Sequence, residues 1–85
     1  MTKKDTTINL TGGIEARPVA MLVQVASQYE SSVYIDLENK HVNAKSIMGM
    51  MSIGLNAGTE VTVIADGNDE DEAVEGVVKF LNGEE

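Results

Sequence analysis

The stretch "SSVYIDLENKHVNAK", residues 31–45, decides the fold that the sequence predicts. Its first half alternates strictly, with Val33, Ile35 and Leu37 on one face, as in a strand that buries one side. Asn39-Lys40 is a short turn, and "HVNAK" returns as a second strand. The stretch therefore predicts a β-hairpin whose apolar face is buried against other elements.

Two further runs outside the hairpin are typical of strands. "TEVTVIAD", residues 59–66, is rich in β-branched residues. "DTTINLT", residues 5–11, places Ile8 and Leu10 on one face, and Gly12-Gly13 ends it. We therefore expect four strands.

Two amphipathic helices are predicted, one over residues 16–30 and one over residues 71–82. Pro18 suits the first turn of the earlier helix, where its missing N–H is not needed. The later helix has an acidic start, which complements the helix macrodipole. Both show the i, i+3, i+4, i+7 spacing of a buried stripe. The stripes are Val19, Leu22, Val23 and Ala26, and Ala73, Val74, Val77, Val78 and Leu81.

With a short middle helix, the element order is β-α-β-β-α-β-α. The predicted fold class is α+β: an open-faced sandwich with a four-stranded antiparallel sheet and three helices on one face. A chain of 85 residues is expected to form a single domain, residues 1–85.

Composition and charge exclude several function classes. The net charge of -8 argues against binding to nucleic acid or to an anionic membrane. No apolar run could span a bilayer and no secretory signal is visible, so we expect a cytoplasmic protein. One histidine and no cysteine cannot build a structural zinc site or a serine–histidine triad, so no metal or cofactor is predicted. His41 is expected on the surface of a strand, without a neighbouring acid.

The segment "NAKSIMGMMSIG", residues 43–54, is the main functional candidate. Ser46 stands at the predicted N-cap of the short helix, where its hydroxyl would satisfy a free backbone N–H. It is also a candidate phosphorylation site, because a helix start tolerates the added negative charge well. The two roles are compatible. Ile47, Met48 and Met51 are expected to be at least partly exposed to a partner, since methionine is common at adaptable binding surfaces.

The segment "GGIEARP", residues 12–18, is a second candidate. It leads into a helix start whose free N–H groups favour anions, and Arg17 adds a planar cation suited to phosphate. Glu15 stands where an anion would be held. It could also be a helix-start acid that contacts Arg17 or the helix dipole.

The blocks "GIEARPVAMLVQVAS" and "VNAKSIMGMMSIG" together resemble HPr, the small phosphocarrier family of the bacterial sugar phosphotransferase system. The resemblance extends over nearly the whole chain and implies that family's open-faced β-sandwich, with the two blocks close in space. In the family, a histidine carries the phosphoryl group at the position of Glu15, while the phosphate-binding arginine is retained as Arg17. The resemblance therefore implies a degenerate phosphocarrier site at Glu15 and Arg17, as in the Crh type, which lacks the histidine.

The same resemblance implies a regulatory role without enzymatic activity. Ser46 would be phosphorylated by HPr kinase/phosphorylase, and the product would serve as corepressor for the catabolite control transcription regulator. Enzymes of the phosphotransferase system are further possible partners. Two alternatives give Glu15 a role, either as the acceptor of an acyl phosphate or as a fixed negative charge that imitates phosphohistidine. The implied partner-binding residues are Arg17, Met21, Ile47, Met48 and Met51.

Overall fold

The computed structural model describes residues 1–9, 16–37, 40–52 and 58–83, with the backbone alone for residues 16–19. Within these ranges the secondary structure follows the predicted order. The elements are β1 (Thr2–Thr7), α1 (Ala16–Ser27), β2 (Ser32–Leu37), β3 (Lys40–Asn43), α2 (Ile47–Met51), β4 (Glu60–Asp66) and α3 (Glu70–Leu81).

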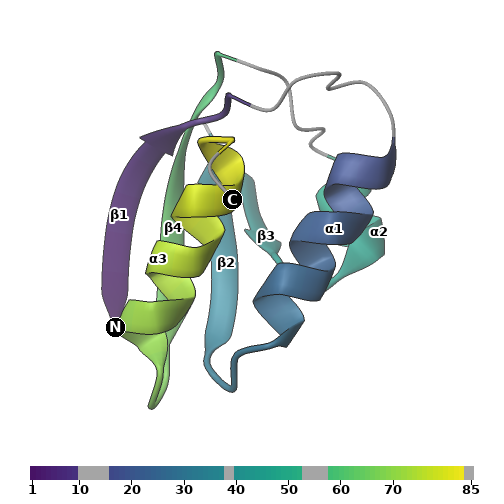
Figure 1. The fold of residues 1–85 in the computed structure, drawn as a ribbon. Coiled ribbons are helices and arrows are strands. Elements are labelled where there is room, and N and C mark those ends of the chain that lie inside the picture. Colours follow the sequence, from purple (N-terminus) through teal and green to yellow (C-terminus); the bar gives the residue numbers. More distant parts are fainter. Residues whose placement is uncertain (10–15, 38–39, 53–57, 84–85) are drawn as a thin grey trace.

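The strands form one four-stranded sheet in the order β1-β4-β2-β3. Each neighbouring pair is antiparallel, and β4 lies between β1 and β2. α1, α2 and α3 all lie on one side of this sheet (Figure 1). The predicted open-faced sandwich is confirmed. In the described part of the chain, no helix is both long and apolar enough to cross a membrane.

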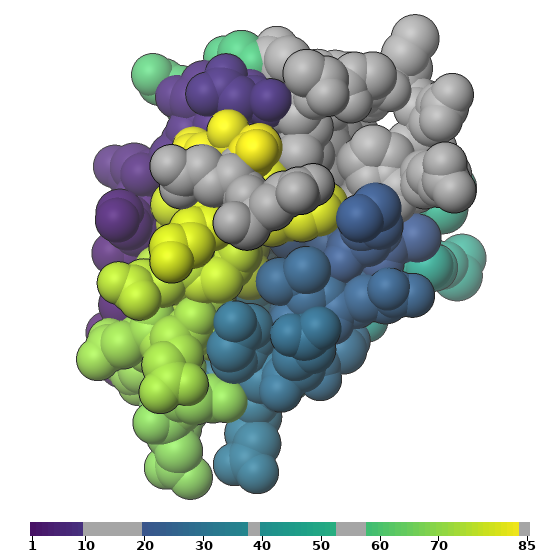
Figure 2. All heavy atoms as spheres, viewed as in Figure 1, coloured from purple at the N-terminus to yellow at the C-terminus, as the bar shows by residue number. Residues whose placement is uncertain are grey.

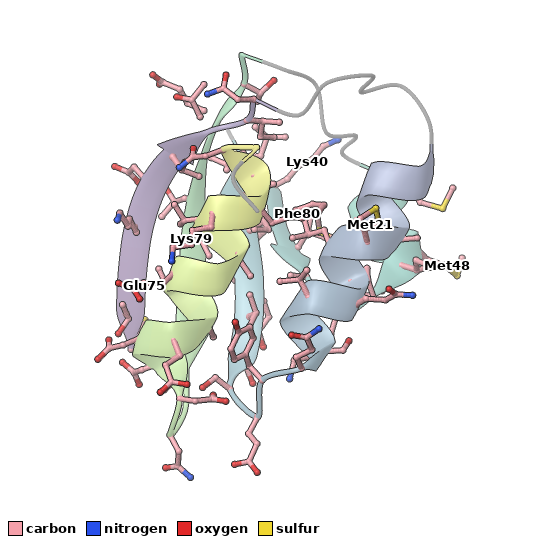
Figure 3. The ribbon with its side chains drawn as sticks, viewed as in Figure 1. Met21, Lys40, Met48, Glu75, Lys79 and Phe80 are labelled. Atoms are coloured by element: carbon pink, nitrogen blue, oxygen red, sulfur yellow. The ribbon has the colours of Figure 1, made fainter. Side chains whose placement is uncertain are left out.

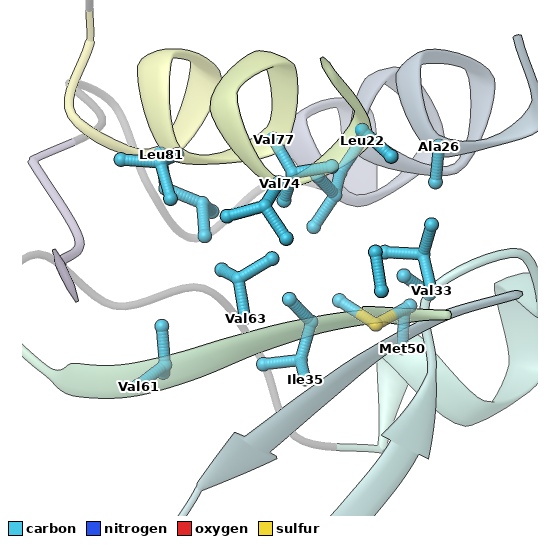
Figure 4. Packing of buried hydrophobic residues seen from close by; sticks show 14 of the residues in the cluster. Leu22, Ala26, Val33, Ile35, Met50, Val61, Val63, Val74, Val77 and Leu81 are labelled. Atoms are coloured by element: carbon cyan, nitrogen blue, oxygen red, sulfur yellow. The ribbon is translucent and has the colours of Figure 1, made fainter. Parts of the chain in front are cut away.

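The core lies between the sheet and the two longer helices (Figure 4). The buried side chains of β2 alternate along the strand, whereas β4 buries Val61 and the consecutive residues 63–65. Val33, Ile35 and Val63 are fully buried. α1 contributes Leu22 and Ala26, and the predicted stripe of α3 is buried throughout. Burial of this apolar surface is the main favourable term in folding. Figure 2 shows α1 and α3 side by side on one face of the molecule.

The prediction for the first strand was wrong in its bounds. β1 spans Thr2–Thr7 instead of residues 5–11, and Leu10 lies outside the described residues. β1 is an edge strand of polar residues that is held by its backbone pairing with β4. β1 therefore lacks the alternation of apolar and polar residues on which the strand prediction was based. Ile8, which follows the strand, is buried, and its N–H donates to the Thr59 carbonyl at 2.9 Å.

The hairpin turn also differs from the prediction by one residue. Lys40 is the first residue of β3 and pairs with Leu37, so it does not belong to the turn. This register places His41 opposite Asp36. α1 ends at Ser27, three residues before the predicted end, and its last turn tightens: the Tyr29 N–H donates to the Ala26 carbonyl at 3.3 Å.

Candidate functional site

Ser46 caps the N-terminus of α2. Its backbone is extended, with φ -103° and ψ 112°, and its Oγ accepts a hydrogen bond from the Gly49 N–H at 3.2 Å. Its carbonyl accepts a hydrogen bond from the Met50 N–H at 2.9 Å. A serine in this geometry satisfies one of the free N–H groups at the helix start. The predicted N-cap role is confirmed.

The turn before Ser46 fixes the position of its hydroxyl. The Asn43 side chain accepts a hydrogen bond from the Lys45 N–H at 2.8 Å, and the Asn43 carbonyl accepts one from the Ser46 N–H at 3.0 Å. The Lys45 ammonium donates to the Tyr29 carbonyl, just beyond the end of α1, at 2.7 Å. These contacts tie the start of α2 to α1, and sequence reasoning gave Lys45 no such role.

Two residues inside α2 bring it close to β3 and the core. Met50 is fully buried and anchors the helix. A Cβ at Gly49 would lie 3.1 Å from Cγ1 of Val42 and 3.4 Å from Oγ of Ser46. Glycine therefore allows α2 to pack against β3 while the Gly49 N–H still reaches the serine oxygen.

The remaining large side chains of α2 face solvent. Ile47, Met48 and Met51 are 46%, 82% and 56% exposed, and Met21 of the adjacent α1 is 50% exposed. Met48 points away from the sheet, and Met21 lies on the outer side of α1 (Figure 3). We call these four residues the methionine patch. The predicted exposure of Ile47, Met48 and Met51 is confirmed.

The methionine patch is apolar in a protein that is otherwise strongly acidic. Neither α1 nor α2 contains an acidic residue, although the chain has 14 of them. Negative charge is instead concentrated in the first turn of α3, at Glu70, Asp71 and Glu72. A phosphate on Ser46 would therefore place a strong negative charge beside a surface that lacks one.

The second candidate segment, residues 12–18, lies partly outside the described residues. Glu15 lies outside the described residues, and Arg17 belongs to the first turn of α1 with its backbone alone described. The anion site at these two residues stays a prediction.

The prediction that His41 has no acidic neighbour was wrong. Its Nδ1 contacts Oδ1 of Asp36, because the hairpin register sets the two residues opposite each other. The ring also stacks on Tyr34, with ring centroids 4.5 Å apart. His41 is nevertheless exposed on a strand, as expected.

Comparison with known proteins agrees with this architecture. A family model described as "PTS HPr component phosphorylation site" matches residues 2–83. The HPr-like protein Crh of Halalkalibacterium halodurans is 43% identical over 84 residues, which cover 99% of this chain and 100% of that protein. The HPr-like protein Crh of Bacillus subtilis is 44% identical, with 99% of each chain covered. The crystal structure of HPr-C-His from Thermoanaerobacter tengcongensis matches with a TM-score of 0.88 and 42% identity, covering 100% of this chain and 99% of that one.

The fold class and the serine-capped helix, together with these matches, define a small protein of the phosphotransferase-system type. The chain belongs to the HPr family, and its full-length similarity to two Crh proteins supports the Crh type within it. Members of this family are phosphocarrier or regulatory proteins.

Proposed function

We propose that this chain is an HPr-like regulatory protein of bacterial carbon catabolite control that is switched by phosphorylation of Ser46. HPr kinase/phosphorylase would add the phosphate in the cytoplasm, and the product would act as corepressor for the catabolite control transcription regulator. The observation that carries the proposal is the half-buried Ser46 hydroxyl at the start of α2, directly beside the exposed methionine patch.

The local geometry suits a modification that leaves the fold intact. Ser46 Oγ accepts one hydrogen bond, from the Gly49 N–H, and phosphate oxygens can accept the same N–H. The added charge of about -1.5 to -2 would be favoured near free N–H groups. Because α2 has only five residues, these local N–H groups matter more than a helix macrodipole.

The test of the switch is phosphorylation in vitro. The protein is incubated with HPr kinase/phosphorylase and ATP, and its intact mass is measured. We expect the addition of one phosphate, which Ser46→Ala abolishes. Ser52→Ala, which changes the serine at the other end of α2, is the matched control and should still be modified. Failure of the wild-type protein to gain a phosphate would end the proposal.

The methionine patch is the proposed docking surface for kinase and regulator, together with Arg17. Met48 is its most exposed member, at 82%, so Met48→Gln removes apolar contact area with little expected effect on folding. We expect this change to weaken binding of the phosphorylated protein to the regulator about tenfold. Lys79→Gln, on the exposed side of α3, is the control and should bind as the wild type does (Figure 3).

We further propose that phosphocarrier activity is lost because Glu15 replaces the carrier histidine. A carboxylate lacks the imidazole nitrogen that accepts and passes on a phosphoryl group. With phosphoenolpyruvate and the first enzyme of the phosphotransferase system, the wild-type protein should remain unlabelled and Glu15→His should gain a label. A base-labile phosphate on wild-type Glu15 would instead support the acyl-phosphate alternative.

The charge of Glu15 leads to a separate test. If it imitates a phosphohistidine, Glu15→Gln should alter affinity for the regulator relative to the wild type and to Glu15→His. Equal affinities of all three proteins would remove this alternative.

A further inference from the structure

The face of the sheet opposite the helices has no covering element among the described residues. Val33 and Ile35 of β2 and Val61 and Val63 of β4 point toward α1 and α3 (Figure 4), so the alternate positions, including the buried Ile64, face the other way. We call these outward positions the open sheet face. Its residues are Lys3, Asp5, Thr7, Ser32, Tyr34, Asp36, His41, Asn43, Glu60, Thr62, Ile64 and Asp66.

The open sheet face is hollowed and partly apolar. A hollow of about 360 Å³ is lined in part by Tyr34, His41 and Ile64, and a larger one of about 590 Å³ adjoins it, with Asp36 on the wall of both. Ile64 is only 5% exposed although no helix covers it. It pairs with Tyr34, whose ring stacks on His41 at an interplanar angle of 21°. The face therefore has an ordered apolar wall as well as polar groups.

Two carboxylates of this face are held in place by neighbouring side chains. The Thr62 hydroxyl donates to Oδ1 of Asp5 at 2.6 Å, and His41 contacts Oδ1 of Asp36. In the part of the chain that the structure describes, Oδ2 of each has no hydrogen-bond partner. An acceptor held in position with one oxygen free loses little side-chain entropy when a donor binds.

The charge of the open sheet face selects the kind of partner. Asp5, Asp36, Glu60 and Asp66 carry negative charge there. The opposing charges are the Lys3 side chain and the terminal ammonium, which lies 3.9 Å from Oδ1 of Asp66, so negative charge is in excess. Lysine and arginine side chains complement such a surface, and their aliphatic stems can pack beside Tyr34 and Ile64. An extended segment with basic residues at alternate positions would match the spacing along a strand.

We propose that the open sheet face binds a basic polypeptide segment of a partner protein. This surface is separate from the methionine patch, because α2 packs on α1 and β3 on the helical side of the sheet. One molecule could therefore hold a basic partner on one side while Ser46 and the methionine patch remain accessible on the other.

The test measures binding of a fluorescein-labelled peptide with lysines at alternate positions, by fluorescence anisotropy. The sheet-face variant combines Asp36→Asn with Glu60→Gln. The control combines Glu72→Gln with Glu75→Gln on the exposed side of α3, and it removes the same charge. We expect the sheet-face pair to weaken binding about five- to tenfold and the control pair less than twofold.

Three outcomes would overturn the proposal. The wild-type protein could fail to bind the peptide, or both pairs could weaken binding equally, which would indicate general charge attraction. The wild-type protein could instead sediment as a dimer and the double variant of the sheet face as a monomer. This result would assign the face to a second copy of this chain. Should the sheet-face pair unfold the protein, amide shift mapping of the wild type decides: shifts must centre on Tyr34, Asp36 and Thr62 and leave the start of α3 unchanged.

Discussion

At the level of single residues, Ser46 combines a structural and a proposed regulatory role in one oxygen. Its Oγ accepts the Gly49 N–H, so Ser46→Ala should lower the free energy of unfolding by about 1 kcal/mol. Ser46→Asp retains an acceptor at the cap and should stay within about 0.3 kcal/mol of the wild type. Urea unfolding followed by circular dichroism measures both. Ser27→Ala, an exposed serine at the end of α1, is the control, and a loss as large as that of Ser46→Ala would contradict the capping role.

Gly67 lies close against Ser31. Its φ is 155°, and a Cβ there would lie 2.7 Å from the Ser31 Cα. Ser31 cannot move away easily, because it is buried and both its N–H and its hydroxyl donate to Asp69. Gly67→Ala should therefore destabilise the protein by about 2–3 kcal/mol in urea unfolding.

Gly58 is a matched control for the Gly67 change. It also has a positive φ, of 89°, but nothing lies within 4 Å of an added Cβ. Gly58→Ala should cost only the backbone strain, about 1 kcal/mol. Equal losses for the two variants would show that contact with Ser31 is not responsible.

At the level of elements, the bounds of a strand or helix were predicted more accurately when the element buries more apolar surface. β2 and the stripe of α3 were predicted closely because their buried positions are periodic. β1 was misplaced because its sequence, TKKDTT, is polar and its position depends on pairing with β4. The hairpin turn was predicted to include Lys40, which belongs to β3, and the contact between His41 and Asp36 was missed with it. Backbone pairing sets the bounds of β1 and the position of the hairpin turn. It cannot be predicted from the alternation of hydrophobic residues.

Glu70, at the start of α3, should make the free energy of unfolding depend on pH. The terminal ammonium lies 2.8 Å from Oε2 of Glu70, and the Thr2 hydroxyl and Gly67 N–H also donate to its carboxylate. These hydrogen bonds, chiefly the one to the terminal ammonium, hold the pKa of Glu70 at about 2, below the ordinary 4.5. Because folding lowers this pKa, the ionised carboxylate stabilises the folded protein fully at pH values above the ordinary pKa of 4.5. That contribution is lost as pH falls from 4.5 toward 2.

Urea unfolding at a series of pH values tests this dependence. Glu70→Gln should be less stable than the wild type at neutral pH, and the difference should shrink on acidification. Glu72→Gln changes an exposed acid in the same turn, and its curve should run parallel to that of the wild type. A difference between Glu70→Gln and wild type that stays constant down to the lowest pH would contradict the assignment.

At the level of the whole molecule, sequence reasoning found the parts of the helical site but only some of their arrangement. Ser46 and the three exposed residues of α2 were identified because capping residues and methionine-rich runs carry a local signal. The contact from Lys45 to the Tyr29 carbonyl was not, because it joins residues 16 positions apart through a side chain that usually faces solvent. The open sheet face was missed because its residues come from four strands and gather only when the sheet forms.

The two faces of the molecule should act independently. Ser46 lies beside α1 and β3 on the helical side, whereas the open sheet face is built largely on β2 and β4. Mutations at sites without shared partners usually have additive free energies. We therefore expect Ser46→Asp to leave the affinity of the basic peptide within about twofold of the wild type, in the presence or absence of Asp36→Asn. A double-mutant cycle by fluorescence anisotropy measures the coupling, and a coupling above about 0.5 kcal/mol would show that the sheet transmits the charge at Ser46 to its open face.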